Sequence, residues 1–412
     1  MTDTEKSDKD DTPTSKDKTS RDTGDSGDEA EPTIAQDIVV TKYNMAADIV
    51  NGILKELTAK CQVGQSVGEL CDYGDKNLLE RANKVFRKEK EMKKGIAFPT
   101  CISINNCVCH FSPLRSEPDV TLAEGDVVKI DLGAHIDGFI AVGAHTLVVG
   151  ASKDKKVSGR KADAILAAHN CLEAAIRMLR PNQHKNMEVT DVIQKISEAF
   201  HCKPVENMLS HELKKNKIDG PKIIIQNPGE KQRQDTEKCE FEQYEVYAID
   251  VLISTGEGKA REMDSRTTVF KRNDEVVYQL KMKMSRSFLS DVDKRVGSMP
   301  FTLRSFEEEN KAKMGVLECE RHNLVKPFQV LYERDGEVVA QFKSTVLILP
   351  SGLLKITGLP LESELYESEY KVEDKKLVQL IQSSLKPGKK KTKKKEGGDA
   401  TKGEANGAAA EP

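Results

Sequence analysis

Residues 98–146, FPTCISINNCVCHFSPLRSEPDVTLAEGDVVKIDLGAHIDGFIAVGAHT, decide the fold of this chain. Apolar residues alternate along this stretch and glycines bound its segments, a pattern that predicts two strand hairpins. One predicted strand carries Asp131 between Ile130 and Leu132, and His110 follows an earlier one. An unpaired charge inside a protein is costly, so a buried Asp131 would need a partner. The alternative is an edge strand with Asp131 facing water.

A second copy of this pattern lies further along the chain. The segment Asp126-Val-Val-Lys-Ile-Asp131-Leu is matched by Glu245-Val-Tyr-Ala-Ile-Asp250-Val. Internal similarity exposes architecture. It predicts a duplicated unit in which two equivalent strands bring Asp131 and Asp250 into one cleft.

The composition excludes some classes of protein. In 412 residues, no apolar run approaches the length of a membrane span and the N-terminus lacks a secretory signal, so no membrane insertion is expected. The nine cysteines are odd in number and scattered, which suits reduced thiols rather than a disulfide framework. Cys107-Val-Cys109-His110 lacks a second ligand pair at zinc-site spacing, so buried thiols in a strand are expected there.

We expect three parts: an acidic, disordered segment (1–32), one α/β domain (33–368) and a mostly disordered tail (369–412). The first part has 11 acidic and 5 basic residues and almost no apolar side chain. In the second, Thr33 and Gln36 suggest a capping box for a helix whose apolar face includes Ile38, and a second helix is expected over 67–90. Further expected elements are helices over 161–179 and 190–200 and strands over 222–226, 245–254, 266–270, 328–333 and 338–349. A helical insertion (about 272–330) is expected to hold helices over 276–296 and 305–314.

Lysine and arginine gather in three places, where they could contact RNA phosphates or form solvated surface. The candidates are Arg81, Lys84, Arg87, Lys88, Lys90, Lys93 and Lys94; Lys271, Arg272, Lys281, Lys283 and Arg286 near or in the insertion; and Lys389, Lys390, Lys391, Lys393, Lys394 and Lys395 in the tail. A short helix over 375–383 contains Leu377-Val-Gln-Leu380-Ile381, which resembles a leucine-rich corepressor docking motif except at its last leucine. An amphipathic helix with no partner is the alternative.

The chain resembles the type 2 methionine aminopeptidases and, more closely, the proliferation-associated (ErbB-3-binding) protein family, their non-peptidase relatives. The resemblance covers about residues 34–365. It rests on Phe98-Pro-Thr, Asn105-Asn106, Lys129-Ile-Asp131, Tyr247-Ala-Ile-Asp250, Ser254-Thr-Gly256 and Gln341-Phe342. It implies an α/β pita-bread fold, in which two pseudo-symmetric halves surround one cleft, with a helical insertion of the type 2 kind.

In the peptidases, the resemblance implies two metal ions held by two aspartates, a histidine and two glutamates. Asp131 matches the first aspartate and His211 the histidine, while Asp250 replaces the first glutamate. Val142 and Lys343 fall on the second aspartate and the last glutamate. Of two further cleft histidines in the peptidases, one matches His110 and the other falls on Asp219. Val142 and Lys343 together shift the pocket charge by three units, so a metal pair is not expected; a single metal on Asp131, His211 and Asp250 is the remaining alternative.

These residues predict an inactive aminopeptidase fold without a cofactor. The resemblance implies that it binds structured RNA, the large ribosomal subunit and ribonucleoprotein particles, and regulatory proteins, the last through 377–381. It further implies roles in translation, ribosome biogenesis and growth control, in cytoplasm, nucleus and nucleolus. An active metallo-aminopeptidase with a rearranged site is the alternative, and a chaperone that binds nascent chain ends in the cleft is compatible with the first hypothesis. We also predict that the Lys343 ammonium bridges Asp131 and Asp250, unless it extends to solvent along its strand.

Overall fold

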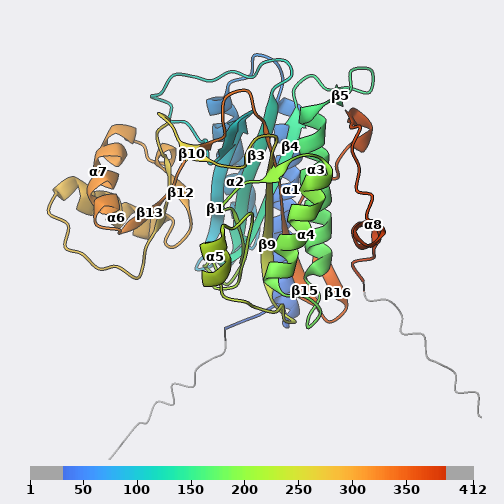
Figure 1. Ribbon diagram of the computed structural model, residues 1–412. Helices are drawn as coiled ribbons and strands as arrows, with labels where there is room; N and C mark the ends of the chain where they lie inside the picture. The colour runs from blue at the N-terminus through green and yellow to red at the C-terminus, as the bar shows by residue number, and fades with distance from the viewer. Residues whose placement is uncertain (1–30, 387–412) are drawn as a thin grey trace, which may run out of the picture. The chain divides into compact units, whose positions relative to one another are not determined.

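An antiparallel sheet of nine strands organises the computed structural model, which describes residues 31–386 (Figure 1). Its main path runs β1-β3-β4-β15-β9-β7-β8, with β16 beside β15 and β6 beside β9. The strands are β1 Lys94–Ile104, β3 Val127–Ile136, β4 Phe139–Val148, β6 Lys203–Pro204, β7 Leu209–Glu212, β8 Ile223–Ile225, β9 Val246–Ser254, β15 Val339–Leu349 and β16 Gly352–Lys355. All these neighbours pair antiparallel. The two copies of the repeated sequence form β3 and β9, one on each side of the central pair β4 and β15.

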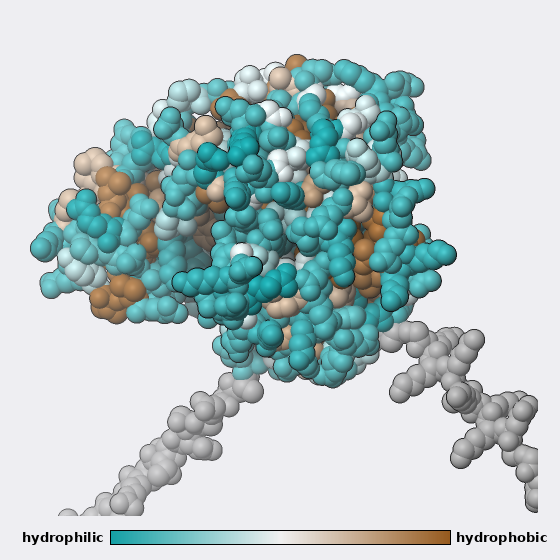
Figure 2. Space-filling view, viewed as in Figure 1, coloured by the Kyte–Doolittle hydropathy of each residue, from teal (hydrophilic) through white to brown (hydrophobic). Residues whose placement is uncertain are grey.

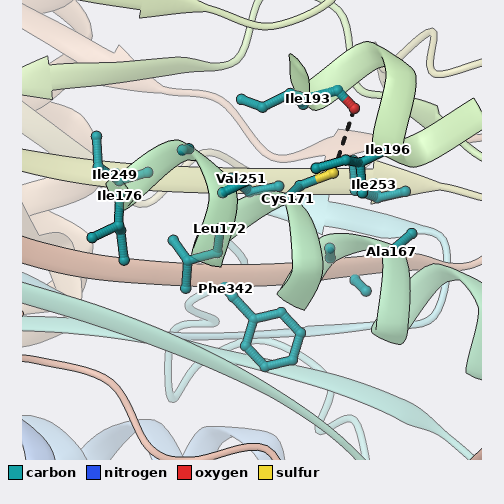
Figure 3. Close-up of a cluster of buried hydrophobic side chains, with 14 of the residues drawn as sticks. Ala167, Cys171, Leu172, Ile176, Ile193, Ile196, Ile249, Val251, Ile253 and Phe342 are labelled. Atoms are coloured by element: carbon teal, nitrogen blue, oxygen red, sulfur yellow. Dashed lines mark hydrogen bonds between the residues drawn. The ribbon is translucent and has the colours of Figure 1, made fainter. Parts of the chain in front are cut away.

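Two helix pairs pack on the sheet, and each pair covers one half. Helices α1 (Asp37–Lys60) and α2 (Val67–Lys84) lie against β1, β3 and β4, whereas α3 (Arg160–Met178) and α4 (Asn186–Ala199) lie over the half that contains β9 and β15. Figure 3 shows the hydrophobic core beneath α3 and α4, in which Leu172 and Ile176 of α3 face Ile249 and Val251 of β9 and Phe342 of β15. The helix pairs repeat with the strands, as the duplicated sequence predicts.

Successive side chains of a strand point to opposite faces of the sheet, so the direction of Phe342 determines the face on which Gln341 and Lys343 lie. Phe342 points into the helix layer, where its ring lies 5.4 Å from that of His145 and 5.5 Å from that of His169. Gln341 and Lys343 therefore point to the opposite face of the sheet.

The insertion forms a small unit on that opposite side (Figure 1). It contains α6 (Lys283–Arg295), α7 (Glu309–Arg321) and a three-stranded sheet of β11 (Val269–Arg272), β12 (Phe301–Thr302) and β13 (Val325–Phe328). Phe288, Phe301 and Phe306 fill its core. The buried guanidinium of Arg304 ties it to α2, because Nε lies 2.9 Å from Asp72 and Nη2 pairs with Asp75.

Short elements complete the domain. They are β2 (Cys107–Cys109), β10 (Arg261–Glu262) and β14 (Leu331–Tyr332) in one sheet; β5 (Val157–Ser158) with β17 (Tyr366–Glu367); and α5 (Glu230–Asp235), η1 (Leu303–Ser305), η2 (Ser363–Leu365) and α8 (Lys375–Gln382). Leu377, Leu380 and Ile381 of α8 pack, partly buried, against the cluster around α3. All nine cysteines are free thiols. Along residues 31–386, no helix is both long and apolar enough to cross a membrane.

Several predicted boundaries are wrong, for local reasons. The second helix ends at Lys84, not at residue 90, because Val85 is extended and Phe86 has a φ of 45°, which no helix tolerates. The first begins at Asp37, and neither Thr33 nor Gln36 forms the predicted capping box; Ile38 is half-exposed instead of buried.

In the insertion, α6 begins seven residues later than predicted, at Lys283, where its N-cap residue Met282 is extended. Residues 305–314 were predicted as the second helix, but Leu303–Ser305 forms a 3₁₀ turn and α7 begins at Glu309. Strand β11 starts at Val269 and not at Arg266.

Candidate functional site

One row of paired residues crosses the centre of the sheet and carries the charged site. Asp131 of β3 pairs with Ala144 of β4, Ala144 with Lys343 of β15, and Lys343 with Asp250 of β9. Residues directly opposite each other in neighbouring strands project from the same face. The row therefore places two carboxylates and one ammonium on the face that Phe342 does not use. The small side chain of Ala144 leaves room for Lys343 to reach across β4 toward Asp131.

Lys343 lies between the two aspartates, as the sequence predicts. Its Nζ is 2.5 Å from Asp131 Oδ2 and 3.1 Å from Asp250 Oδ2. The side chains of Lys343, Asp131 and Asp250 are 11%, 5% and 15% exposed, so neither an edge strand nor a solvent-directed lysine describes the site. Gln341 Nε2 donates to Asp250 Oδ1 at 2.9 Å and approaches Asp131 Oδ2 at 3.4 Å. The site thus contains an ammonium and an amide that both face two carboxylates.

The charges of this group are coupled. Burial disfavours the ammonium form of Lys343, but Asp131 and then Asp250 outweigh burial, so the pKa of Lys343 lies above its ordinary value. Burial raises the pKa of Asp250, Lys343 opposes that rise and Asp131 adds to it, so the net shift is upward. Lys343 therefore stays protonated at neutral pH and acts as a fixed internal cation.

An aromatic wall borders this group. His110, at a φ of 65° just after β2, packs against both Phe98 and Phe328, with ring centroids 5.9 and 5.3 Å away, and the two phenylalanine rings lie 5.3 Å from each other. Lys343 Nζ lies 5.3 Å from the centroid of the Phe98 ring. The Nδ1 of His110 is 3.0 Å from the carbonyl oxygen of Gln329, and burial lowers the pKa of His110 to about 4. His110 is therefore a neutral imidazole at neutral pH.

His211 and Asp219 complete the set that sequence comparison assigns to the cleft. His211 of β7 pairs with Ala248 of β9, two residues from Asp250 and on the same face. Burial lowers the pKa of His211, and its Nδ1 is buried without a hydrogen-bond partner among residues 31–386. Asp219 forms an ion pair with Lys271, so its charge is already balanced.

These side chains do not fit a pair of metal ions. Val142, where a second aspartate would be needed, is 2% exposed, belongs to an apolar cluster and offers no oxygen. Lys343 places an ammonium between the remaining carboxylates, where a cation would bind. Nor does the described part of the chain contain any cluster of three or more His, Cys, Asp or Glu side chains suited to a metal. Two divalent ions would have to displace the ammonium without gaining the missing ligands.

The predicted basic residues divide into three groups. Arg81, Lys94, Lys271 and Arg272 contact the protein itself: Arg81 pairs with Glu56, Lys94 donates to the Val85 and Phe86 carbonyls, Lys271 pairs with Asp219, and Arg272 with Asp293. Exposed residues are Lys84, Arg87, Lys88, Lys90, Lys93, Lys281, Lys283 and Arg286. The lysine cluster 389–395 lies outside the described residues.

Sequence reasoning assigned no role to some residues of the site. Gln341 belongs to the motif Gln341-Phe342, and its spacing of two from Lys343, which puts both side chains on one face of a strand, is the signal of its place in the site. Exposed lysines at 214 and 217 were missed altogether, although the run Lys214-Lys-Asn-Lys217 marks them.

Comparison with known proteins gives consistent results. Residues 41–267 match the model of metallopeptidase family M24. Proliferation-associated protein A of Dictyostelium discoideum is 47% identical over 361 residues, which cover 88% of this chain and 92% of that protein. ErbB-3 binding protein 1 of Arabidopsis thaliana is 43% identical, with 93% and 95% covered. The solved structure of a thermophilic Arx1 has a TM-score of 0.80 and 29% identity, over 85% of this chain and 100% of that one. The predicted pita-bread fold is confirmed.

Proposed function

Because the chain belongs to metallopeptidase family M24 and, within it, to the proliferation-associated (ErbB-3-binding) proteins, we propose that it is a catalytically inactive aminopeptidase fold that binds other macromolecules. The contact of Lys343 with Asp131 and Asp250 carries this proposal. A co-catalytic metal pair must be bridged by carboxylates while it retains a bound water. Here a single ammonium occupies the space between the two carboxylates, and Val142 supplies no ligand.

Structured RNA, within ribosomal and other ribonucleoprotein particles, is the proposed ligand. Five exposed cations in 84–93 support this part: Lys84, Arg87, Lys88, Lys90 and Lys93. None of the five enters an ion pair with residues 31–386. Cations without interleaved exposed aromatics suit contacts with phosphates more than stacking with bases. The lysines at 389–395 would add to the same electrostatic attraction.

Regulatory proteins are the second proposed class of partner, in keeping with relatives named as proliferation-associated and ErbB-3-binding proteins. The apolar residues Leu377, Leu380 and Ile381 pack against the α3 cluster, so a partner would have to displace α8 to reach them. Through these contacts the protein would act in translation, ribosome biogenesis and growth control, in cytoplasm, nucleus and nucleolus.

Peptidase activity and metal content test the inactive site. Purified protein with added cobalt or manganese should release no methionine from short peptides, and elemental analysis should find no stoichiometric metal pair. The double change Val142→Asp with Lys343→Glu should bind more metal than either single change, because only the pair restores both carboxylates. Turnover by the unaltered protein, or two metals per chain, would show the alternative, an active metallo-aminopeptidase.

RNA binding is tested by titrating the full chain with a structured RNA at several salt concentrations. Deleting 386–395 should weaken binding and flatten its salt dependence for unrelated RNAs, because fewer counterions are released. Deleting 396–412, which contains a single lysine, is the matched control. An affinity loss with an unchanged salt slope would mean that the tail does not act through phosphates. No binding by the full chain would refute this part of the proposal.

A further inference from the structure

The basic loop after α2 continues, through backbone contacts, into a second basic segment that is distant in sequence. Residues 84–94 carry six cations against two carboxylates. At the end of this loop the carbonyl of Lys93 accepts a hydrogen bond of 2.7 Å from the Asp137 amide, in the turn between β3 and β4. The carbonyl of Gly138, in the same turn, accepts a bond of 2.8 Å from the Asn216 amide. Asn216 lies in the tight turn Lys214-Lys-Asn-Lys217, which has three cations and no acid.

Glycine at position 138 is what permits this close docking. Gly138 has a φ of 79°, and a Cβ there would lie 2.2 Å from Asn216 Oδ1. The turn closes on itself through two hydrogen bonds of 3.0 Å between the backbones of Lys214 and Lys217. The lysines of this turn are therefore held on a fixed scaffold beside the basic loop.

The carboxylates near this turn do not neutralise all of its lysines, so the turn stays positively charged. Asp137 is neutralised mainly by Lys42, whose Nζ is 2.6 Å away, while Lys215 lies 3.6 Å from the same oxygen. Lys214 lies 3.7 Å from Glu212, and its side chain remains 44% exposed. Lys217 is exposed and has no ion pair within 31–386. At least two ammonium groups of the turn are thus available to an external anion.

The same turn contacts the insertion on its other side. Ser298 Oγ donates to the carbonyl of Asn216 at 2.8 Å, just beyond the C-terminal end of α6. The last turn of α6 carries the exposed cations Lys294 and Arg295. The turn 214–217 therefore links the basic loop of the main domain to a basic helix end of the insertion.

We propose that these three segments form one RNA-binding surface, the basic strip, which follows the phosphate backbone of a duplex RNA. Its members are the half-buried Lys215 and the exposed cations Lys84, Arg87, Lys88, Lys90, Lys93, Lys214, Lys217, Lys294 and Arg295. This assignment rests on the proposed RNA-binding function, to which it adds the binding site and the form of the RNA. A duplex RNA suits this surface because the strip offers no aromatic ring for base stacking. Phe86 packs, partly buried, against apolar side chains of α1 and α2, and Phe139 is buried beneath Lys42 and Lys215.

The insertion also exposes a group of hydrophobic side chains. Figure 2 shows hydrophobic residues at the surface of the insertion. Val277, Met314 and Leu317 of the insertion are 95%, 54% and 55% exposed. These residues lie outside the basic strip, and nothing in the structure identifies a partner that covers them.

The test measures binding of a duplex RNA hairpin of arbitrary sequence to the full chain as a function of salt. The variant is Lys214→Gln with Lys217→Gln, which leaves Lys215 and its contact with Asp137 unchanged. For B-form DNA each phosphate contact contributes about 0.9 to the slope of log affinity against log salt concentration. The variant should therefore bind several-fold more weakly at 0.1 M salt, with a slope reduced by about 1 to 2. Lys195→Gln with Lys371→Gln, two exposed lysines elsewhere, should leave the slope unchanged.

The outcomes separate this inference from the proposed function. If the unaltered chain binds no RNA, the RNA-binding function itself fails. If the chain binds RNA but Lys214→Gln/Lys217→Gln has the slope of the unaltered chain, RNA binds elsewhere and the basic strip is refuted. If that variant instead loses binding to polyglutamate while RNA binding is unchanged, the surface serves an acidic protein and the proposal is overturned. Circular dichroism of both variants guards against loss of folding.

Discussion

Replacing Lys343 with methionine tests the central feature of the site. Methionine keeps most of the volume and the apolar stem but removes the ammonium. Asp131 and Asp250 would then face each other with Gln341 as their shared donor. Removing one partner of a buried ion pair typically costs about 3–5 kcal/mol, against at most about 1 kcal/mol for an exposed pair. Because the three side chains are 5–15% exposed, we expect a loss of about 3 kcal/mol or more at pH 7.

The pH dependence of this loss identifies its cause. Without Lys343, repulsion from Asp131 raises the folded-state pKa of Asp250 further, and a proton can take the place of the ammonium. A folded carboxyl with a raised pKa loses stability as the pH rises from its unfolded value, near 4, through its folded value. The difference between the two proteins should therefore be smaller at pH 5 than at pH 8.

Urea unfolding at both pH values measures these free energies. Lys343→Met with Asp131→Asn and Asp250→Asn should recover much of the stability, because no buried charge remains. Lys156→Met is the control for an exposed pair, since Lys156 and Glu367 are 41% and 62% exposed, and should cost less than about 1 kcal/mol. A loss below about 1 kcal/mol for Lys343→Met, or one that does not change with pH, would refute the internal-cation role.

Two further predictions concern the insertion and the buried histidines. Arg304→Met should destabilise the protein by about 3–5 kcal/mol in urea unfolding, because the guanidinium is buried against Asp72 and Asp75. Arg115→Met is the control: it removes a 58% exposed partner of the same Asp72 and should cost about 1 kcal/mol or less. Burial lowers the pKa of His135 to about 4, so between about pH 6.5 and 4 the unfolded chain binds a proton that the folded chain does not, and stability falls as the pH falls. His135→Asn keeps an acceptor for the Gly138 amide. This variant should reduce the slope of unfolding free energy against pH, between pH 5 and 6, by about 1.4 kcal/mol per pH unit. An unchanged slope would show that His135 is protonated in both the folded and the unfolded state.

Sequence predicted the site well because its information is local and periodic. The repeated Ile-Asp pattern predicts that two equivalent strands bring Asp131 and Asp250 together, and both aspartates contact Lys343. Helix ends were predicted less well, because they depend on single backbone conformations such as that of Phe86. The basic run around 81–94 appeared uniform, yet Lys94 caps the carbonyls of Val85 and Phe86 while Lys93 is exposed. Only the tertiary contacts distinguish a lysine that caps carbonyl groups from a neighbouring lysine that is exposed to solvent.

The register of the central strands explains how the charges could change while the fold remained. Asp131, Ala144, Lys343 and Asp250 lie in one cross-strand row, so a change of side chain within that row alters the charge of the cleft without moving a strand. A metal pair and a lysine solve the same problem, the repulsion between two carboxylates on facing halves of the sheet. Lysine does so from within the chain, at the cost of the open coordination positions that hydrolysis requires. A change of side chains on this face can therefore replace metal ligands with an internal cation while every strand stays in place, so the proposed loss of catalysis is compatible with retention of the fold.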